Sequence, residues 1–151
     1  MPSDRPITKS PNLQIDTVYP LRHFPDRVEP FPTIYYLTDP ALVHAMSELE
    51  RQQFIGRFER RLADDAELRA AYHADHERYR DTRWAMLTEN DRQLIEQSAS
   101  LSRSFRGGIA GIANLDTVKC LHAHYAHHLA TAEAGGTTVG QMIDEQLGMT
   151  E

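Results

Sequence analysis

The chain has little cysteine and little positive charge. Its 151 residues include one cysteine, and its 16 lysines and arginines are outnumbered by 22 aspartates and glutamates. A single cysteine cannot form a disulfide within the chain, so we expect a reducing, cytoplasmic setting. The net charge of −6 is opposite to the basic balance that phosphate backbones require, so nucleic acid is not an expected partner.

Long hydrophobic runs are also missing. No segment approaches the ~20 apolar residues that span a bilayer, and the amino-terminal stretch lacks the apolar core of a signal peptide. We therefore expect no membrane association. The length and the 40% share of hydrophobic residues are typical of one ordinary domain.

Proline is absent after residue 40, since all eight prolines precede or occupy that position. Because proline interrupts helices, the sequence predicts an extended, proline-rich arm over residues 1–30, disordered over about its first ten residues, and a single helical domain over 31–151. The arm is expected to cover the domain with its apolar side chains: Leu13, Ile15, Val18, Tyr19 and Phe24. The aromatic and β-branched run over 31–38 predicts one short strand.

Apolar residues at helical spacing dominate the rest of the chain. Asp39 followed by Pro40 is typical of a helix start, and Gly135-Gly136 of a helix end. The expected helices cover 40–62, as one bent helix or two short ones, then 65–87 and 88–105 as an antiparallel pair, 116–134 and 138–147. The predicted fold class is mainly α, with one or two short strands.

The segment from Lys119 to Ala130 holds the cysteine and four of the eight histidines. On a helix with ~100° per residue, Cys120, His124 and His127 share one narrow stripe. Sulfur and imidazole ligands favour Zn²⁺ or Fe²⁺ over Mg²⁺ or Ca²⁺. The stripe is therefore a candidate metal site, with Asp39 as a candidate further ligand.

The spacing of this stripe leaves the ligand set open. Its three side chains spread along ~10 Å of helix axis, so only two of them can meet one ion without distortion. His122 and His128 are supporting candidates, and another element or subunit would complete the site, for example through His23. The alternative is a polar core in which these histidines bond backbone carbonyls and carboxylates.

A glycine-rich segment, Gly107-Gly108-Ile-Ala-Gly111, follows two arginines and precedes Lys119. Free amides at a helix start together with cationic side chains favour an anion. The candidate anion site consists of Arg103, Arg106, Gly107, Gly108 and Lys119. The alternative is a tight connector that lets two helices pack closely.

Asp75 lies on the apolar stripe of the helix expected over 65–87, between Tyr72 and Tyr79. An unpaired carboxylate there would be costly, so we expect it to support a histidine of the later helix, to pair with Arg83, or to form a half-exposed salt bridge. His76 is expected on a solvated face of the same helix.

Four stretches carry a family resemblance: Phe31-Pro-Thr-Ile-Tyr-Tyr-Leu-Thr-Asp-Pro40, Gly107-Gly-Ile-Ala-Gly111, Val118-Lys-Cys-Leu-His-Ala-His-Tyr-Ala-His127 and Val139-Gly140. Over residues 30 to 145 the chain resembles the bacterial family catalogued as domain of unknown function 501. The resemblance implies no activity, because the family has none established. It also implies cysteines at position 39 and in the arm, where this chain has Asp39 and no second cysteine, so a ligand set that used them is altered or lost here.

Three function classes stay open. A small-ligand or metal protein, with a hydrolytic enzyme as one form, would hold an anionic substrate at Arg103, Arg106 and Lys119. A non-enzymatic interaction or regulatory module would dock a protein partner or a second copy of the chain through the arm. A redox or metal sensor would use Cys120. The sequence identifies no complete set of nucleophile, base and orienting group, so whether the protein is an enzyme stays open.

Overall fold

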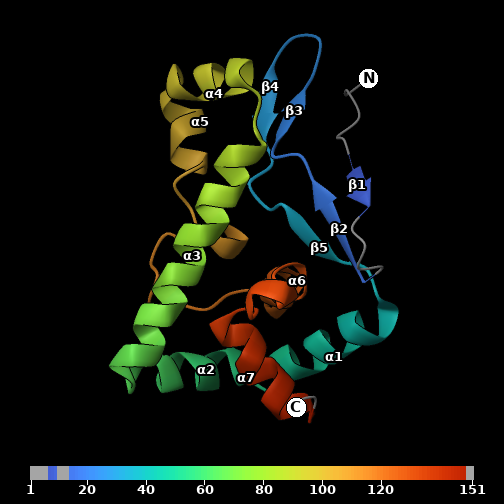
Figure 1. The fold of residues 1–151 in the computed structure, drawn as a ribbon, viewed down its shortest axis with the longest axis vertical. Helices are drawn as coiled ribbons and strands as arrows, with labels where there is room; N and C mark the ends of the chain where they lie inside the picture. Colours follow the sequence, from blue (N-terminus) through green and yellow to red (C-terminus); the bar gives the residue numbers. More distant parts are fainter. Residues whose placement is uncertain (1–6, 10–13, 149–151) are drawn as a thin grey trace.

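The computed structural model describes residues 7–9 and 14–148, and most of these are helical (Figure 1). The strands are β1 (Ile7–Lys9), β2 (Ile15–Val18), β3 (Leu21–His23), β4 (Val28–Pro30) and β5 (Tyr35–Leu37). The α-helices are α1 (Pro40–Arg51), α2 (Phe54–Ala63), α3 (Ala66–Met86), α4 (Glu89–Glu96), α5 (Ala99–Ser104), α6 (Leu121–Ala130) and α7 (Thr138–Leu147), with short 3₁₀ turns η1 (Ile109–Gly111) and η2 (Ala132–Ala134).

The amino-terminal region forms two small antiparallel sheets. One has the strand order β1-β2-β5, with Ile15 opposite Leu37, and the other pairs β3 with β4. The extended arm predicted over residues 1–30 is not shown as such: residues 14–30 contain β2, β3 and β4 of these two sheets, with Ile15 and Val18 buried. Prolines 20 and 30 flank or end the short strands, where a missing N–H is tolerated. Leu13 and most of the first ten residues lie outside the described residues.

The predicted starts of three helices are confirmed. Asp39 caps α1 by accepting from the amides of Ala41 and Leu42, Asp65 caps α3, and Thr88 caps α4. The segment 40–62 is two helices, broken at Gln53, which has a positive φ of 70°. The segment 88–105 is also two helices, because Ser98 caps a new one, so the single helix predicted there is wrong.

The prediction of a helix from residue 116 is wrong as well, because α6 begins only at Leu121. Cys120, at its start, has a positive φ of 35°, which no helical residue adopts. Two carboxylates hold the preceding loop: Glu59 accepts from the amide of Val118 at 2.8 Å, and Glu50 from that of Leu121 at 2.7 Å.

Helix α6 lies at the centre of the fold, against β5 on one side and against α1 and α7 on the other (Figure 1). Seven of its ten residues are buried, including Leu121 and Tyr125 of the main hydrophobic cluster. The long α3 runs along one side of the molecule, from α2 at one end to α4 and α5 at the other. This central position makes α6 the element around which the histidines are arranged.

Candidate functional site

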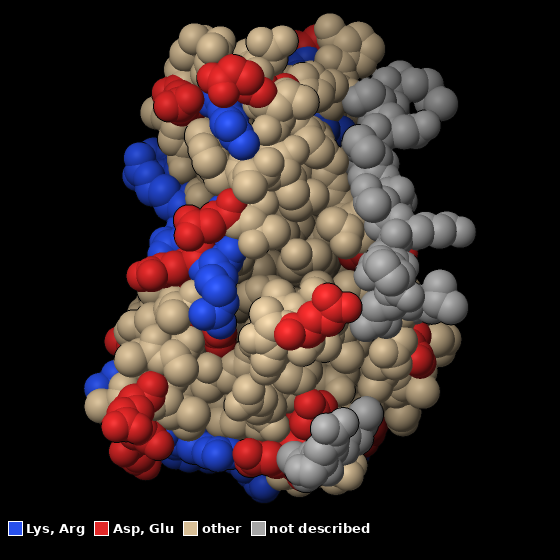
Figure 2. Space-filling view, viewed as in Figure 1, with Lys and Arg blue, Asp and Glu red and all other residues tan. Residues whose placement is uncertain are grey.

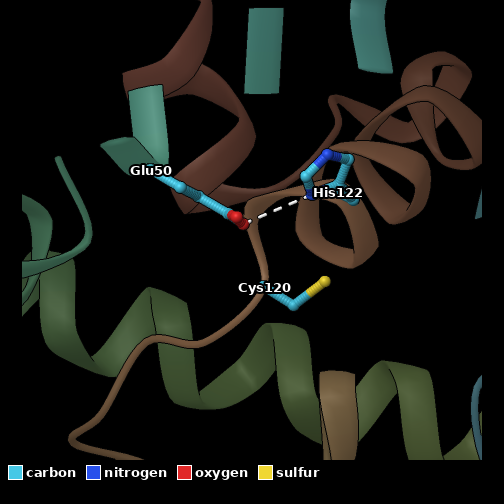
Figure 3. Close-up of side chains that lie close together, drawn as sticks. All are labelled: Glu50, Cys120 and His122. Atoms are coloured by element: carbon cyan, nitrogen blue, oxygen red, sulfur yellow. Dashed lines mark ion pairs between the residues drawn. The ribbon is translucent and has the colours of Figure 1, made fainter. Parts of the chain in front are cut away.

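Three side chains from two distant segments meet at the start of α6. Among the described residues, Glu50, Cys120 and His122 form the one group of three candidate metal ligands whose ligand atoms all lie within 4.8 Å of one another. Glu50 comes from the last turn of α1, and Figure 3 shows its carboxylate facing the ring of His122, with the Cys120 thiol beside them. The Nδ1 atom of His122 lies 3.3 Å from Oε2 of Glu50.

The other ring nitrogen of His122 fixes the ring. Its Nε2 lies 3.2 Å from the carbonyl oxygen of Val43 and 3.1 Å from Oγ of Ser47. In the neutral tautomer that carries its proton on Nε2, this atom donates to the carbonyl of Val43 and Nδ1 keeps a lone pair, whereas in the other tautomer Nε2 accepts from Ser47 and Nδ1 donates to Glu50. Metal-binding histidines typically donate their second N–H to such a backbone carbonyl.

Cys120 is exposed, and its backbone is held in an unusual conformation for a residue with a side chain. A positive φ at a non-glycine residue costs about 1–3 kcal/mol and persists only where the surroundings impose it. Here hydrogen bonds from the amides of Val118 and Leu121, to Glu59 and Glu50, hold the chain on both sides of Cys120. The result is a thiol held next to His122 at the surface.

A pocket of about 310 Å³ opens beside this group. Its lining includes Cys120 and His122 at one end and residues around β5 at the other, among them Thr33, Tyr35 and Tyr36. The segment 35–37 therefore closes part of a pocket next to Cys120. Asp39 instead caps α1, and no described group of ligand atoms within 4.8 Å combines it with Cys120 or a histidine.

His124 and His127 face inward and are 0% and 2% exposed. They lie among aromatic rings: His127 stacks on Tyr35 at 5.8 Å and meets Tyr79 edge-on at 4.9 Å, while His124 lies 6.0 Å from the ring of His76. Because Cys120 precedes the helix and points to the surface, the predicted stripe of Cys120, His124 and His127 is not assembled as one site.

These buried rings are neutral. Burial lowers the pKa of His76 to about 4 and the pKa values of His124 and His127 to about 3 each. His76 accepts from the amide of Ile109 at 3.0 Å, whereas neither ring nitrogen of His124 has a hydrogen-bond partner among the described residues. The prediction that His76 lies on a solvated face is wrong, because η1 packs directly over it.

His128 fits the alternative of a polar core. Its Nδ1 accepts from the amide of Thr137 at 2.8 Å, so its Nε2 carries a proton and donates to Asp144 at 2.8 Å. Asp75, the other supporting candidate, is buried and accepts from the amide of Thr138 at 2.7 Å. It also pairs with Arg78, and its partner is neither Arg83 nor a histidine side chain.

The predicted anion site is rearranged. The amides of Gly108, Ile109 and Gly111 are used within the fold, by Ile112, His76 and Gly108 respectively, and no α-helix follows the glycines directly. Lys119 is exposed and does not line the pocket that Arg103, Arg106 and Gly107 share. These amides are therefore bonded within the fold, while Arg103 and Arg106 line a pocket.

Sequence reasoning missed Glu50, which lies in an ordinary charged run 70 residues before Cys120. It also treated His122 as a supporting residue, since the helix was expected to continue through Cys120. No local pattern signals either role, because the loop geometry and the packing of α1 on α6 bring the three together.

Comparisons with known proteins give one match. No curated protein and no solved structure matches the chain, and none of the described helices is long and apolar enough to cross a membrane. A family model matches residues 10–145, which extends the resemblance beyond its expected start at residue 30. The chain therefore belongs to the family described as protein of unknown function, DUF501.

Proposed function

We propose that this protein binds a divalent transition metal, Zn²⁺ or Fe²⁺, through Glu50, Cys120 and His122. The observation that carries the proposal is the 3.3 Å contact between Nδ1 of His122 and Oε2 of Glu50. When Nε2 donates to Val43, Nδ1 of the neutral His122 ring directs its lone pair at the carboxylate of Glu50. Nδ1 and Oε2 then repel each other unless a cation lies between them.

The spacing suits a tetrahedral ion. Two nitrogen or oxygen ligands at bond lengths of about 2.1 Å lie about 3.4 Å apart in such a site, close to the observed distance. A thiolate ligand would lie about 3.6 Å from each of them, given a Zn–S bond of about 2.3 Å. Because Cys120 is exposed, rotation about its Cα–Cβ bond can supply this approach.

Three protein ligands leave one coordination position open. This is the arrangement of catalytic rather than structural zinc sites, and the adjacent pocket of about 310 Å³ gives a small ligand access to that position. The proposed function is therefore a metal-dependent small-ligand protein. The competing explanation is a protonated His122 that forms an ordinary ion pair with Glu50, in a module without metal.

Cobalt binding tests the proposal directly. We expect tag-free protein, stripped with a chelator, to bind one equivalent of Co²⁺ and to show the near-ultraviolet absorption of a thiolate–cobalt bond. Cys120→Ala should abolish that band, and His122→Ala should weaken binding by about tenfold or more. His44→Ala is the matched control, because His44 is an exposed histidine of α1 outside the group, and it should bind as the wild type does.

Glu50→Gln separates ligation from folding. The glutamine keeps an oxygen that accepts from the amide of Leu121, so the start of α6 is retained while the charge is lost. We expect native circular dichroism with weaker Co²⁺ binding. Absence of the thiolate band in the wild type, or equal loss of binding in His44→Ala, would contradict the metal site and favour the ion pair.

A further inference from the structure

Arg83 is a buried cation without an acidic partner. Its side chain is 1% exposed, and its guanidinium donates to the carbonyl oxygens of Pro32, Phe105 and Gly107 at 2.9, 2.9 and 2.6 Å. Among the described residues no carboxylate pairs with it. Carbonyl dipoles satisfy its hydrogen bonds, but they do not neutralise its charge.

Three further arginines line a pocket that shares Pro32 and Gly107 with the surroundings of Arg83. Arg80, Arg103 and Arg106 line a pocket of about 560 Å³, and the walls include Pro32 and Gly107, whose carbonyl oxygens accept from Arg83. Arg103 and Arg106 come from α5 and the residues after it, whereas Arg80 comes from α3 and donates to the carbonyl of Arg106 at 3.1 Å.

These rim arginines form no close ion pair among the described residues, although Glu77 and Asp81 line a neighbouring pocket together with Arg80 and Arg106. Elsewhere arginines pair with carboxylates, as Arg51 does with Glu48 and Arg61 with Glu145. None of Arg80, Arg103 and Arg106 forms such a pair among the described residues, although the chain carries a net charge of −6. Blue side chains protrude at the left edge of Figure 2, beside α3 and α5 of Figure 1, with red side chains next to them. An anionic ligand would reduce the repulsion among these clustered cations.

We propose that this pocket binds the phosphate group of a small phosphorylated molecule. A phosphate monoester carries close to two negative charges at neutral pH and accepts paired hydrogen bonds from guanidinium groups. The volume exceeds that of phosphate alone, so an organic part of the ligand contacts the uncharged walls formed by Pro32, Gly111 and Ala113.

Recognition here depends on side chains rather than on the glycine amides. The amides of Gly108, Ile109 and Gly111 are bonded inside the fold, so the segment cannot wrap an anion with its backbone. This inference also does not depend on the metal site, because Glu50, Cys120 and His122 do not line the pocket. An experiment that contradicts the metal site therefore leaves the phosphate pocket untouched, and the reverse also holds.

Calorimetric titration of the full, metal-stripped chain tests the proposal, with inorganic pyrophosphate and inorganic phosphate as probes at constant ionic strength. We expect saturable binding at one site, tighter for pyrophosphate. Arg103→Gln and Arg106→Gln should each weaken it by about tenfold, the loss typical of one charge-assisted contact. Both side chains are exposed, so both variants should keep the native fold by circular dichroism.

Arg60→Gln is the matched control. It removes the same charge from an exposed position of α2 outside the pocket, and pyrophosphate affinity should stay within twofold of the wild type. Absence of saturable binding, or equal weakening by Arg60→Gln, overturns the proposal. Tighter binding of a polyglutamate peptide than of pyrophosphate also overturns it, since the surface would then suit an acidic protein partner.

Discussion

The carboxylate of Asp75 accepts a hydrogen bond from the backbone amide of Thr138 at 2.7 Å, across 63 positions of sequence. Asp75 lies in the middle of α3, and Thr138 is the first residue of α7. The amide of Thr138 has no acceptor within α7, because the first amides of a helix lack an intrahelical partner, and Asp75 supplies the acceptor. A negative charge at a helix start is also favourable. Burial raises the pKa of Asp75, and the amide of Thr138 is the largest opposing influence.

Asp75→Ala should therefore destabilise the fold. The substitution leaves a buried amide without its partner, which costs about 1–3 kcal/mol in the free energy of unfolding. Urea unfolding at pH 7 measures this cost. Asp81→Ala removes an exposed carboxylate from the same helix and should change stability by less than about 0.5 kcal/mol. Equal effects of the two variants would contradict a structural role of the Asp75–Thr138 bond.

The buried imidazoles predict a loss of stability in mild acid. Burial lowers the pKa of His76 to about 4 and those of His124 and His127 to about 3, whereas the unfolded chain protonates these rings near the ordinary value of 6.5. Stability is complete above pH 6.5 and falls as the pH drops toward 4, by about 1.4 kcal/mol per pH unit for each ring. The raised pKa of Asp75 offsets part of this loss, because protonation of that carboxyl favours the folded state.

Urea unfolding at pH 7, 6 and 5 checks this dependence. His124→Leu removes one of the three rings and should reduce the slope of stability against pH by about a third, whatever its effect on stability at pH 7. A wild type equally stable at pH 7 and pH 5 would show that the rings protonate without unfolding.

Two glycines offer a matched pair of substitutions. A Cβ atom at Gly140, in α7, would overlap the buried ring of His128, which is held by Thr137 and Asp144. We expect Gly140→Ala to cost about 1–3 kcal/mol, as overpacking does. At Gly56, in α2, the nearest atom is the flexible end of Arg60 at 3.4 Å, so Gly56→Ala should add about 0.5–1 kcal/mol through helix propensity. A lower melting temperature for Gly140→Ala and a higher one for Gly56→Ala would confirm the two expectations.

Alkylation of Cys120 provides a second measurement on the proposed metal site. The exposed thiol should react readily with iodoacetamide at pH 7.5, and Zn²⁺ should slow the reaction by about tenfold or more because a metal-bound thiolate is a weaker nucleophile. Mass spectrometry follows the modified fraction over time. In His122→Ala the protection should disappear, and protection that persists there would mean that Zn²⁺ binds the thiol without His122.

The strands at the amino terminus predict that truncation is costly. Ile15, Val18 and Leu21 are 2%, 4% and 1% exposed, and full burial of each contributes about 1.5–3 kcal/mol. Deletion of residues 1–30 should therefore lower the melting temperature markedly or prevent folding, as circular dichroism on heating would reveal. An unchanged melting temperature would show that these strands only decorate the helical domain.

The sequence by itself determined those helices that begin at an N-capping side chain. Asp39 before Pro40, Asp65 and Thr88 each place a capping oxygen before an apolar periodic segment, and the structure confirms all three starts. Capping is local, so residues within one turn suffice to predict it. The common helix face of His124 and His127 and the need of Asp75 for a partner followed in the same way from helical spacing.

Only the tertiary structure decided which distant residues the candidate site residues contact. The loop before α6 ends at Cys120, where Glu59 and Glu50 bind the amides of Val118 and Leu121. The thiol therefore lies at the surface beside His122 and not on the predicted stripe with His124 and His127. The burial of His76 under η1 and the grouping of Arg80 with Arg103 and Arg106 depend equally on packing between distant segments. Such contacts join residues tens of positions apart. Local periodicity does not predict which distant carboxylate or arginine packs next to a given residue.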